Sequence, residues 1–113
     1  MRLSNYRFGS VSVDGVVYTE DIQVLPDGEV RSWWRKEGHR VLPEDLSEAL
    51  AANPELIIIG TGYGGRVKIA EETRKLLAER GIELLALKTG EAVEAFNELS
   101  PKRRACALLH LTC

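Results

Sequence analysis

The chain has 113 residues, of which 44% are hydrophobic and 28% are charged, and its formal net charge is −2. Such a length and composition fit one globular domain, residues 1–113, and leave no room for a second. The slightly acidic balance argues against the global basic field of nucleic-acid binders and of proteins that bind anionic membranes.

The N-terminus and the cysteines bear on the compartment. No apolar run follows the first residues, so we expect no secretory signal, and no stretch approaches the length of a membrane span. Cys106 and Cys113 would lie roughly 23 Å apart on one extended segment and could not form a disulfide there. Two free thiols fit a reducing compartment, which predicts a cytoplasmic protein.

The first 35 residues show the alternation of β-strands. Val11 and Val13 precede Asp14-Gly15, a dipeptide that favours a tight hairpin because both residues tolerate positive φ. Apolar residues follow at positions 16, 18, 22 and 24, and Pro26-Asp27-Gly28 predicts a second turn. We expect a three-stranded antiparallel meander, with Glu20 at an edge or a bulge.

Val30–Arg35 is the expected third strand of this meander. By strict alternation Trp34 faces the core, whereas Arg31, Trp33 and Arg35 face outward. An aromatic side chain between cations is also found in nucleic-acid grooves. In a chain of net negative charge, a local protein-contact patch is the better interpretation.

The second half alternates helical periodicity with short apolar runs. Thr89 is the expected N-cap of the last helix. The expected elements are a helix over Pro43–Ala52, a buried strand over Leu56–Ile59, a helix from Ile69 to Arg80, a buried strand over Ile82–Leu87, a helix from Thr89 to Leu99 and a last strand over Arg104–Leu111. This order implies three parallel strands with right-handed crossovers. The predicted fold is a layered α/β domain with a mixed sheet, in which an N-terminal antiparallel meander precedes a parallel βαβαβ portion.

Polar residues gather where these parallel strands end. Ligands of open α/β sheets bind beyond the carboxyl ends of the strands. Three segments follow those ends, namely Gly60–Gly65, Lys88–Glu91 and His110–Cys113. Any small-molecule site is expected there, lined by Gly60, Thr61, Gly62, Gly65, Arg66, Lys88, Thr89 and His110.

The first of these segments has the spacing G-x-G-x-x-G after a strand and before a helix, as in dinucleotide-binding turns. Three features count against that ligand: Arg66–Ile69 separates the last glycine from the helix, Lys88 stands where an acidic residue would hold a ribose, and too few residues follow for a Rossmann domain. A structural loop is the favoured interpretation. A site for a smaller anion, assisted by Arg66 and Lys68, stays open.

Cysteine and histidine near the end of the chain suggest metal or nucleophilic chemistry. Cys106 and His110 would be roughly 13 Å apart on one strand, too far to share a zinc ion. Cys113 could pair with His39 or His110 as nucleophile and base, but nothing in the sequence brings them together. The sequence therefore predicts no metal, no cofactor and no catalytic residue.

Short motifs in a fixed order extend along nearly the whole chain. They are Phe8-Gly9, Tyr18 with Asp21-Ile22, Pro26-Asp27-Gly28, Trp34-Arg35, Gly38-His39, Asp45-Leu46, Ile58–Gly62, Gly81-Ile82, Thr89 with Ala92, Phe96-Asn97 and Leu109–Cys113. With them the chain resembles the Mth938-like family, also called domain of unknown function 498. The Ile-Gly-Thr-Gly loop and the His-Leu-Thr-Cys ending together are the most specific part. Relatives often carry Tyr at the position of Phe96.

The resemblance implies a three-layer α/β fold. The family includes a mitochondrial assembly factor for respiratory complex I and an adipogenesis-associated animal protein, and it supplies no established catalytic residues. It therefore favours a non-catalytic, assembly-factor-like module that contacts an unidentified protein partner. The alternative is a binder of, or an enzyme on, a small anionic ligand at the strand ends. Neither nucleic acid nor membrane is an expected partner.

Overall fold

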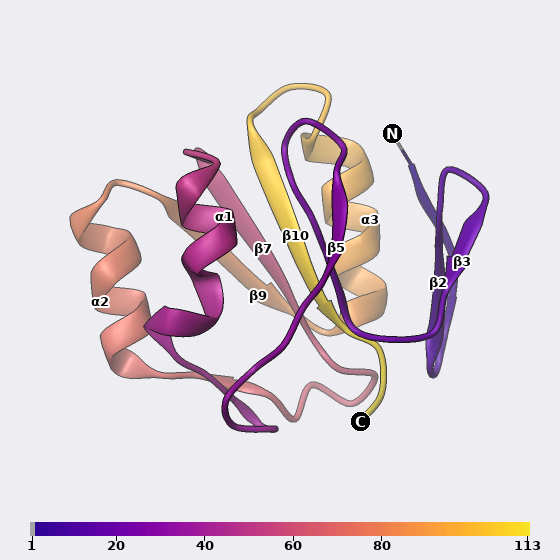
Figure 1. Ribbon diagram of the computed structural model, residues 1–113, viewed down its shortest axis with the longest axis horizontal. Coiled ribbons are helices and arrows are strands. Elements are labelled where there is room, and N and C mark those ends of the chain that lie inside the picture. The colour runs from indigo at the N-terminus through magenta and orange to yellow at the C-terminus, as the bar shows by residue number, and fades with distance from the viewer. Residues whose placement is uncertain (1) are drawn as a thin grey trace.

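The computed structural model describes residues 2–113, and a five-stranded mixed sheet forms its centre. The spatial order of the strands is β5 (Val30–Ser32), β4 (Ile22–Val24), β10 (Ala105–His110), β7 (Leu56–Thr61) and β9 (Glu83–Leu87). β10, β7 and β9 run parallel, whereas β4 and β5 are antiparallel to their neighbours. The three predicted parallel strands are confirmed, and β10, the last strand along the chain, lies in the middle (Figure 1).

The N-terminal strands form a second, antiparallel sheet. It contains β1 (Leu3–Arg7), β2 (Ser10–Val13) and β3 (Val16–Tyr18). The predicted hairpin is present, with φ of 49° at Asp14 and 86° at Gly15. The predicted N-terminal antiparallel meander is confirmed, but it consists of β1, β2 and β3. Its predicted extent to residue 35 is wrong, because the chain leaves this sheet after β3, and β4 and β5 join the central sheet instead. The exposed Glu20 marks the crossing.

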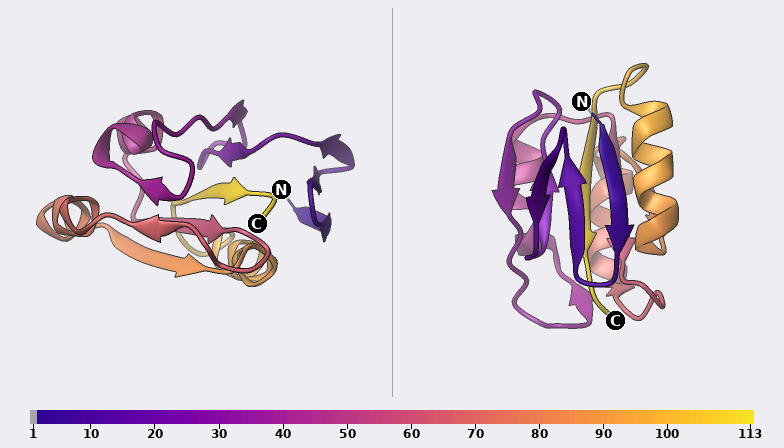
Figure 2. Two further views of the ribbon diagram at one scale, coloured as in Figure 1. Left: turned by 90° about the horizontal axis from the view of Figure 1, so that it is seen from below. Right: turned by 90° about the vertical axis from the view of Figure 1, so that its right-hand side faces the viewer.

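Alternating side chains on the central strands give each face of the sheet its own apolar core. Leu56 and Ile58 of β7 pack on the face covered by α3 (Thr89–Leu99) and by the small N-terminal sheet. Ile57 and Ile59 pack on the other face, beneath a 3₁₀ turn (Pro43–Leu46), α1 (Ser47–Ala51) and α2 (Glu71–Glu79). Figure 2 shows the strands between these helices, so the three-layer α/β fold is confirmed.

Three elements in the second half differ from expectation, two in their boundaries and one in its burial. The helix predicted over Pro43–Ala52 is divided into the 3₁₀ turn and α1. The helix predicted from Ile69 begins at Glu71, because Lys68–Ile69 forms β8, which pairs in parallel with β6 (Arg40–Val41). β9 is an edge strand and only partly buried, since no further strand pairs with it within residues 2–113.

The burial predicted for the two tryptophans is reversed. Trp33 is 4% exposed and Trp34 is 76% exposed. Alternation fails because β5 ends at Ser32, so the strand no longer sets the side-chain directions. Trp33 turns inward, and its indole N–H donates a hydrogen bond to the Asp45 carbonyl at 3.0 Å.

No helix in residues 2–113 combines the length and the apolar character that crossing a membrane requires.

Candidate functional site

The carboxyl ends of β7, β9 and β10 meet in one hydrogen-bonded unit, which we call the strand-end edge. The Gly62 amide donates to Thr89 Oγ1 at 2.9 Å, and the Thr89 hydroxyl donates to the His110 carbonyl at 2.6 Å. The Thr61 hydroxyl donates to the Leu87 carbonyl at 3.0 Å. The three predicted segments therefore converge, through contacts within the chain itself.

Thr89 is not the N-cap that the sequence predicted. Lys88 occupies the cap position without a capping side-chain bond, and Thr89 is the first residue of α3. Its side chain is fully buried and spans from the β7 turn to the end of β10. Its hydroxyl bonds to these two segments instead of capping the helix.

Two glycines of the loop allow close approach of backbone segments. A Cβ on Gly60 would lie 2.8 Å from Thr89 Oγ1, and one on Gly62, whose φ is 106°, would lie 2.7 Å from the Thr112 carbonyl. The tail after β10 thus occupies the side of Gly62 that a pyrophosphate would approach in a dinucleotide-binding turn. This packing supports the structural interpretation of these two glycines.

His110 belongs to a half-buried charge cluster that also holds Asp21 and Arg35. His110 Nδ1 lies 2.7 Å from Asp21 Oδ2, Arg35 Nη1 donates to the same oxygen at 2.9 Å, and the Leu111 amide donates to Asp21 Oδ1 at 2.9 Å. Burial opposes the charge of Asp21, but the bonds from His110, Leu111 and Arg35 outweigh it and lower the pKa of this carboxyl. The Arg35 guanidinium also stacks 4.8 Å from the centre of the Trp33 ring.

The chemical capacity of this cluster is limited by its own contacts. Asp21 orients the imidazole as a carboxylate orients a catalytic base, and Thr112 Oγ1 lies 3.4 Å from His110 Nε2. However, Arg35 shares the carboxylate, and His110 is buried. The cluster links Asp21, directly before β4, to Arg35, which follows β5, and to His110 at the end of β10. Sequence reasoning missed Asp21, whose signal was the break in alternation beside Glu20.

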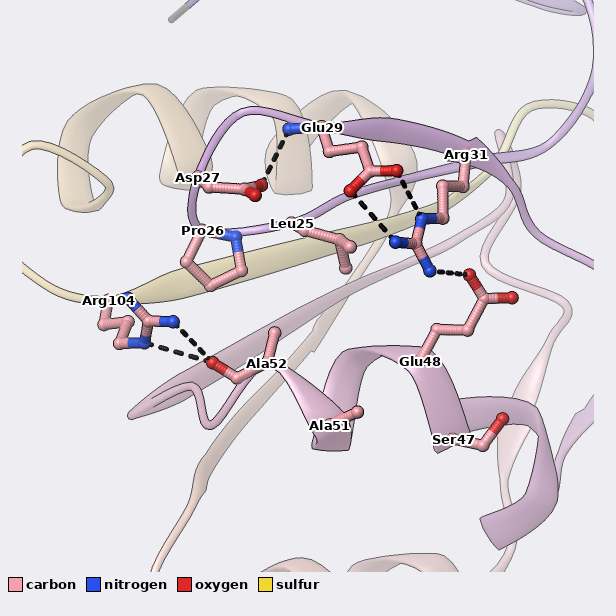
Figure 3. Close-up of a pocket in the computed structure, with 10 residues that line it drawn as sticks. All are labelled: Leu25, Pro26, Asp27, Glu29, Arg31, Ser47, Glu48, Ala51, Ala52 and Arg104. Atoms are coloured by element: carbon pink, nitrogen blue, oxygen red, sulfur yellow. Dashed lines mark hydrogen bonds and ion pairs between the residues drawn. The ribbon is translucent and has the colours of Figure 1, made fainter.

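The predicted contact residues Arg31, Trp33 and Arg35 do not share a surface. Trp33 is buried, Arg35 lies in the charge cluster, and Arg31 lines a separate hollow of about 380 Å³ between the β4–β5 turn and α1 (Figure 3). There Arg31 binds Glu29 and Glu48, each at 2.7 Å. The guanidinium of Arg31 is therefore already satisfied by the chain.

A group of aromatic side chains lies beside the strand-end edge, and we call Tyr6, Phe8 and Tyr63 the aromatic surface. The rings of Phe8 and Tyr63 meet edge to face with centroids 6.0 Å apart, and Tyr6 lies 6.5 Å from Tyr63. Phe8 remains 61% exposed and Tyr63 62%. Burial raises the pKa of Tyr6, whose hydroxyl donates to the Leu111 carbonyl at 3.0 Å.

A hollow of about 290 Å³ adjoins this surface. Tyr6, Tyr63, Lys88, Gly90, Glu91 and Glu94 line it. It has aromatic walls and a rim that carries both signs of charge. The sequence signal for this surface is the position of Tyr63 between two glycines, where a large side chain has little to pack against.

The remaining site residues line an outer groove or pack beside it. Gly65 and Arg66 line that groove, and the Lys88 stem packs beside Gly65. Within residues 2–113, no three His, Cys, Asp or Glu side chains are close enough to hold a metal ion.

These features define a small three-layer α/β domain. A central mixed sheet lies between helices, and a small antiparallel sheet lies beside it. The residues after β10 close the strand-end edge. Residues 3–110 match the family described as a protein of unknown function (DUF498/DUF598), and the chain belongs to this family. The resemblance noted from the sequence is confirmed.

Solved structures agree with this assignment over the full length of the chain. The conserved hypothetical protein PH1505 from Pyrococcus horikoshii is 29% identical, with all of both chains covered and a TM-score of 0.93. A structure titled MT938 is 33% identical, with 99% of this chain and 98% of the other covered and a TM-score of 0.85. A protein from Bordetella parapertussis is 27% identical, with 96% and 92% covered and a TM-score of 0.78.

Proposed function

We propose that this domain is a non-catalytic protein-interaction module, with an assembly-factor-like role, whose contact surface is the aromatic surface beside the strand-end edge. The observation that carries the proposal is the pairing of Phe8 and Tyr63. Each comes from a different part of the chain, and each stays more than half exposed while packing against the other. Isolated exposed apolar residues are ordinary, but adjoining aromatic ones are characteristic of interface centres.

The hollow beside Tyr63 gives the contact a definite shape. Its aromatic walls suit one large apolar side chain, and Lys88, Glu91 and Glu94 suit polar neighbours of that side chain. The expected partner is therefore a polypeptide that presents a single apolar anchor flanked by polar residues. Anchors of this kind supply most of the energy of many interfaces.

The non-catalytic part of the proposal is supported by the satisfied state of the strand-end edge. Thr89 is bonded on both sides, and His110 is held by Asp21 beside Arg35. A general base needs access to a substrate proton. These groups hold the fold together and are turned away from solvent.

Site-specific crosslinking in the source cell tests the surface. A photoreactive phenylalanine at position 63 or position 8 is expected to yield the same discrete adduct, whereas one at Glu79, an exposed residue of the distant helix α2, yields none. The captured partner is then purified and its Kd measured. Adducts that are equally abundant at position 79 would contradict the proposal.

Binding of the purified partner distinguishes contact from mere proximity. Tyr63→Ala is expected to weaken the Kd roughly tenfold or more, as loss of a central aromatic anchor does. Val17→Ala removes an apolar side chain of similar exposure from β3 and is the matched control. A Kd that responds equally to both substitutions would rule the aromatic surface out.

A further inference from the structure

An open groove of about 440 Å³ lies on the outer side of the glycine bend. His39, Gly64, Gly65, Arg66 and Lys68 line it. Its volume falls within the range of small-molecule sites. The lining contains an imidazole, a guanidinium and an ammonium group but no carboxylate.

The cations at this groove are free of internal partners. Within residues 2–113, no carboxylate oxygen lies within 4.0 Å of the charged nitrogens of Arg66 or Lys68. The same holds for Lys88, which lines the neighbouring hollow with Glu91 and Glu94. Arg40 is the register partner of Lys68 in the β6–β8 strand pair. Unlike Lys68, it forms an ion pair, with Glu72 at 3.2 Å. A Cβ on Gly65 would lie 3.3 Å from Lys88 Cγ, so the Lys88 stem packs beside the groove.

Two of the residues that line the groove carry backbone donors without a partner. The amides of Gly64 and Arg66 have no acceptor in the described part of the chain, whereas those of Gly65 and Val67 donate to carbonyls of their own loop. Gly65 has a φ of 75°, which turns the backbone between the two free amides. Free amides at a glycine-containing turn are a common element of anion sites.

We propose that this groove binds a small ligand through a phosphate group. A phosphate monoester carries close to two negative charges and three terminal oxygens, which match several donors of different kinds. Arginine recognises such a group through paired bonds, and lysine acts on it as a point charge. The site goes beyond the proposed interaction role. It keeps Gly65 and Arg66 of the site that the sequence predicted, together with Lys68. It leaves out Gly60, Gly62, Thr89 and His110, which contacts within the chain close off.

Titration followed by NMR tests the site, with inorganic pyrophosphate as the probe. The amide resonances of Gly64, Gly65 and Arg66 are expected to shift together and to saturate by about 10 mM, above a millimolar Kd. The double variant Arg66→Ala/Lys68→Ala is expected to weaken binding roughly tenfold. Both side chains are exposed, and a preserved spectrum elsewhere confirms that the variant is folded.

The matched control removes the same charge from another surface. Arg74→Ala/Lys75→Ala alters two exposed cations of α2 and is expected to change the Kd less than about twofold. An equal loss in both variants would mean diffuse attraction and would overturn the proposal. The absence of loop shifts would also overturn it. Succinate binding as tightly as pyrophosphate would overturn the phosphate assignment and leave a general anion groove.

Discussion

A single oxygen atom, the hydroxyl of Thr89, connects the turn after β7, the start of α3 and the end of β10. Thr89→Val keeps the shape of the side chain but leaves the Gly62 amide and the His110 carbonyl unpaired in a buried place. We expect it to lower the free energy of unfolding by about 2–3 kcal/mol, and Thr89→Ser, which retains the hydroxyl, by about 1 kcal/mol. Urea denaturation of both variants measures the difference. Equal losses would show that the bonds contribute little.

The ionisation of Asp21 predicts a pH dependence of stability. Its folded pKa is lower than the usual 3.8, so the charged carboxyl stabilises the fold above about that pH, and this contribution is lost as pH falls through the folded pKa. Asp21→Asn is expected to be less stable than the parent at pH 7 by about 1–3 kcal/mol. The gap should close progressively below pH ~4. Unfolding curves at pH 7, 5 and 3 measure it, and a gap that is constant across this range would disprove the linkage.

The two cysteines are expected to differ in reactivity. Burial raises the pKa of Cys106 to about 12, while Cys113 is exposed. Because the thiolate is the reactive form, iodoacetamide should add once to the folded protein, at Cys113, and a second time only after denaturation. Intact-mass spectrometry with and without denaturant counts the additions. Two rapid additions under native conditions would contradict the burial of Cys106.

At the scale of elements, β5 ends at Ser32, and as a result Trp33, not Trp34, is buried and contributes to stability. Trp33→Ala is expected to cost about 3–5 kcal/mol, since it empties a buried site and removes the bond to Asp45. Trp34→Ala should change stability by less than ~0.5 kcal/mol, because that side chain faces solvent. Thermal or urea unfolding of the pair provides the test. A larger loss of stability for Trp34→Ala than for Trp33→Ala would mean that Trp34 is the buried residue, as strict alternation predicted.

Elements with strong internal patterns were predictable, and those that depend on distant partners were not. The apolar run Leu56–Ile59 predicts β7, and apolar residues at helical spacing predict α3. β1 has no such pattern, since Asn5 adopts a φ of 52° and Asn97, far along the chain, holds the Leu3 backbone from both sides. β6 and β8 are two residues each and exist only as a pair.

The same distinction applies to the candidate site. Parallel topology alone predicts that the three segments meet, and they do. That the meeting point is closed depends on the direction of the tail after His110, which the sequence pattern does not encode. The solvent-facing residues Phe8 and Tyr63 were missed because contact between two separate turns leaves no periodic signal.

At the scale of the molecule, protection against hydrogen exchange should follow position in the sheets. β10 and β7 are paired on both sides and completely buried, whereas β3 and β5 are edges. We expect amides of β10 to exchange slowest and those of β3 and β5 to exchange by local opening. Exchange monitored by NMR measures each amide. Equal protection of β3 and β10 would show that the two sheets open only together.

The molecule also shows how little a net charge says about a local surface. The sum of −2 includes Arg66 and Lys68, which line one groove without an ion pair to any carboxylate in the described chain. Many of the acids that balance them lie elsewhere, for example Glu29 and Glu48 around Arg31. A slightly negative net charge is therefore compatible with a local anion groove.

The central position of β10 has a consequence for biosynthesis. β4 and β7 leave the ribosome well before residues 105–110, yet they pair with those residues and not with each other. Until β10 emerges, the place between β4 and β7 is a vacant slot, and both strands have an edge with unpaired backbone groups. A chaperone that recognises extended apolar segments would compete for that slot during translation, until residues 105–110 emerge and pair with both strands.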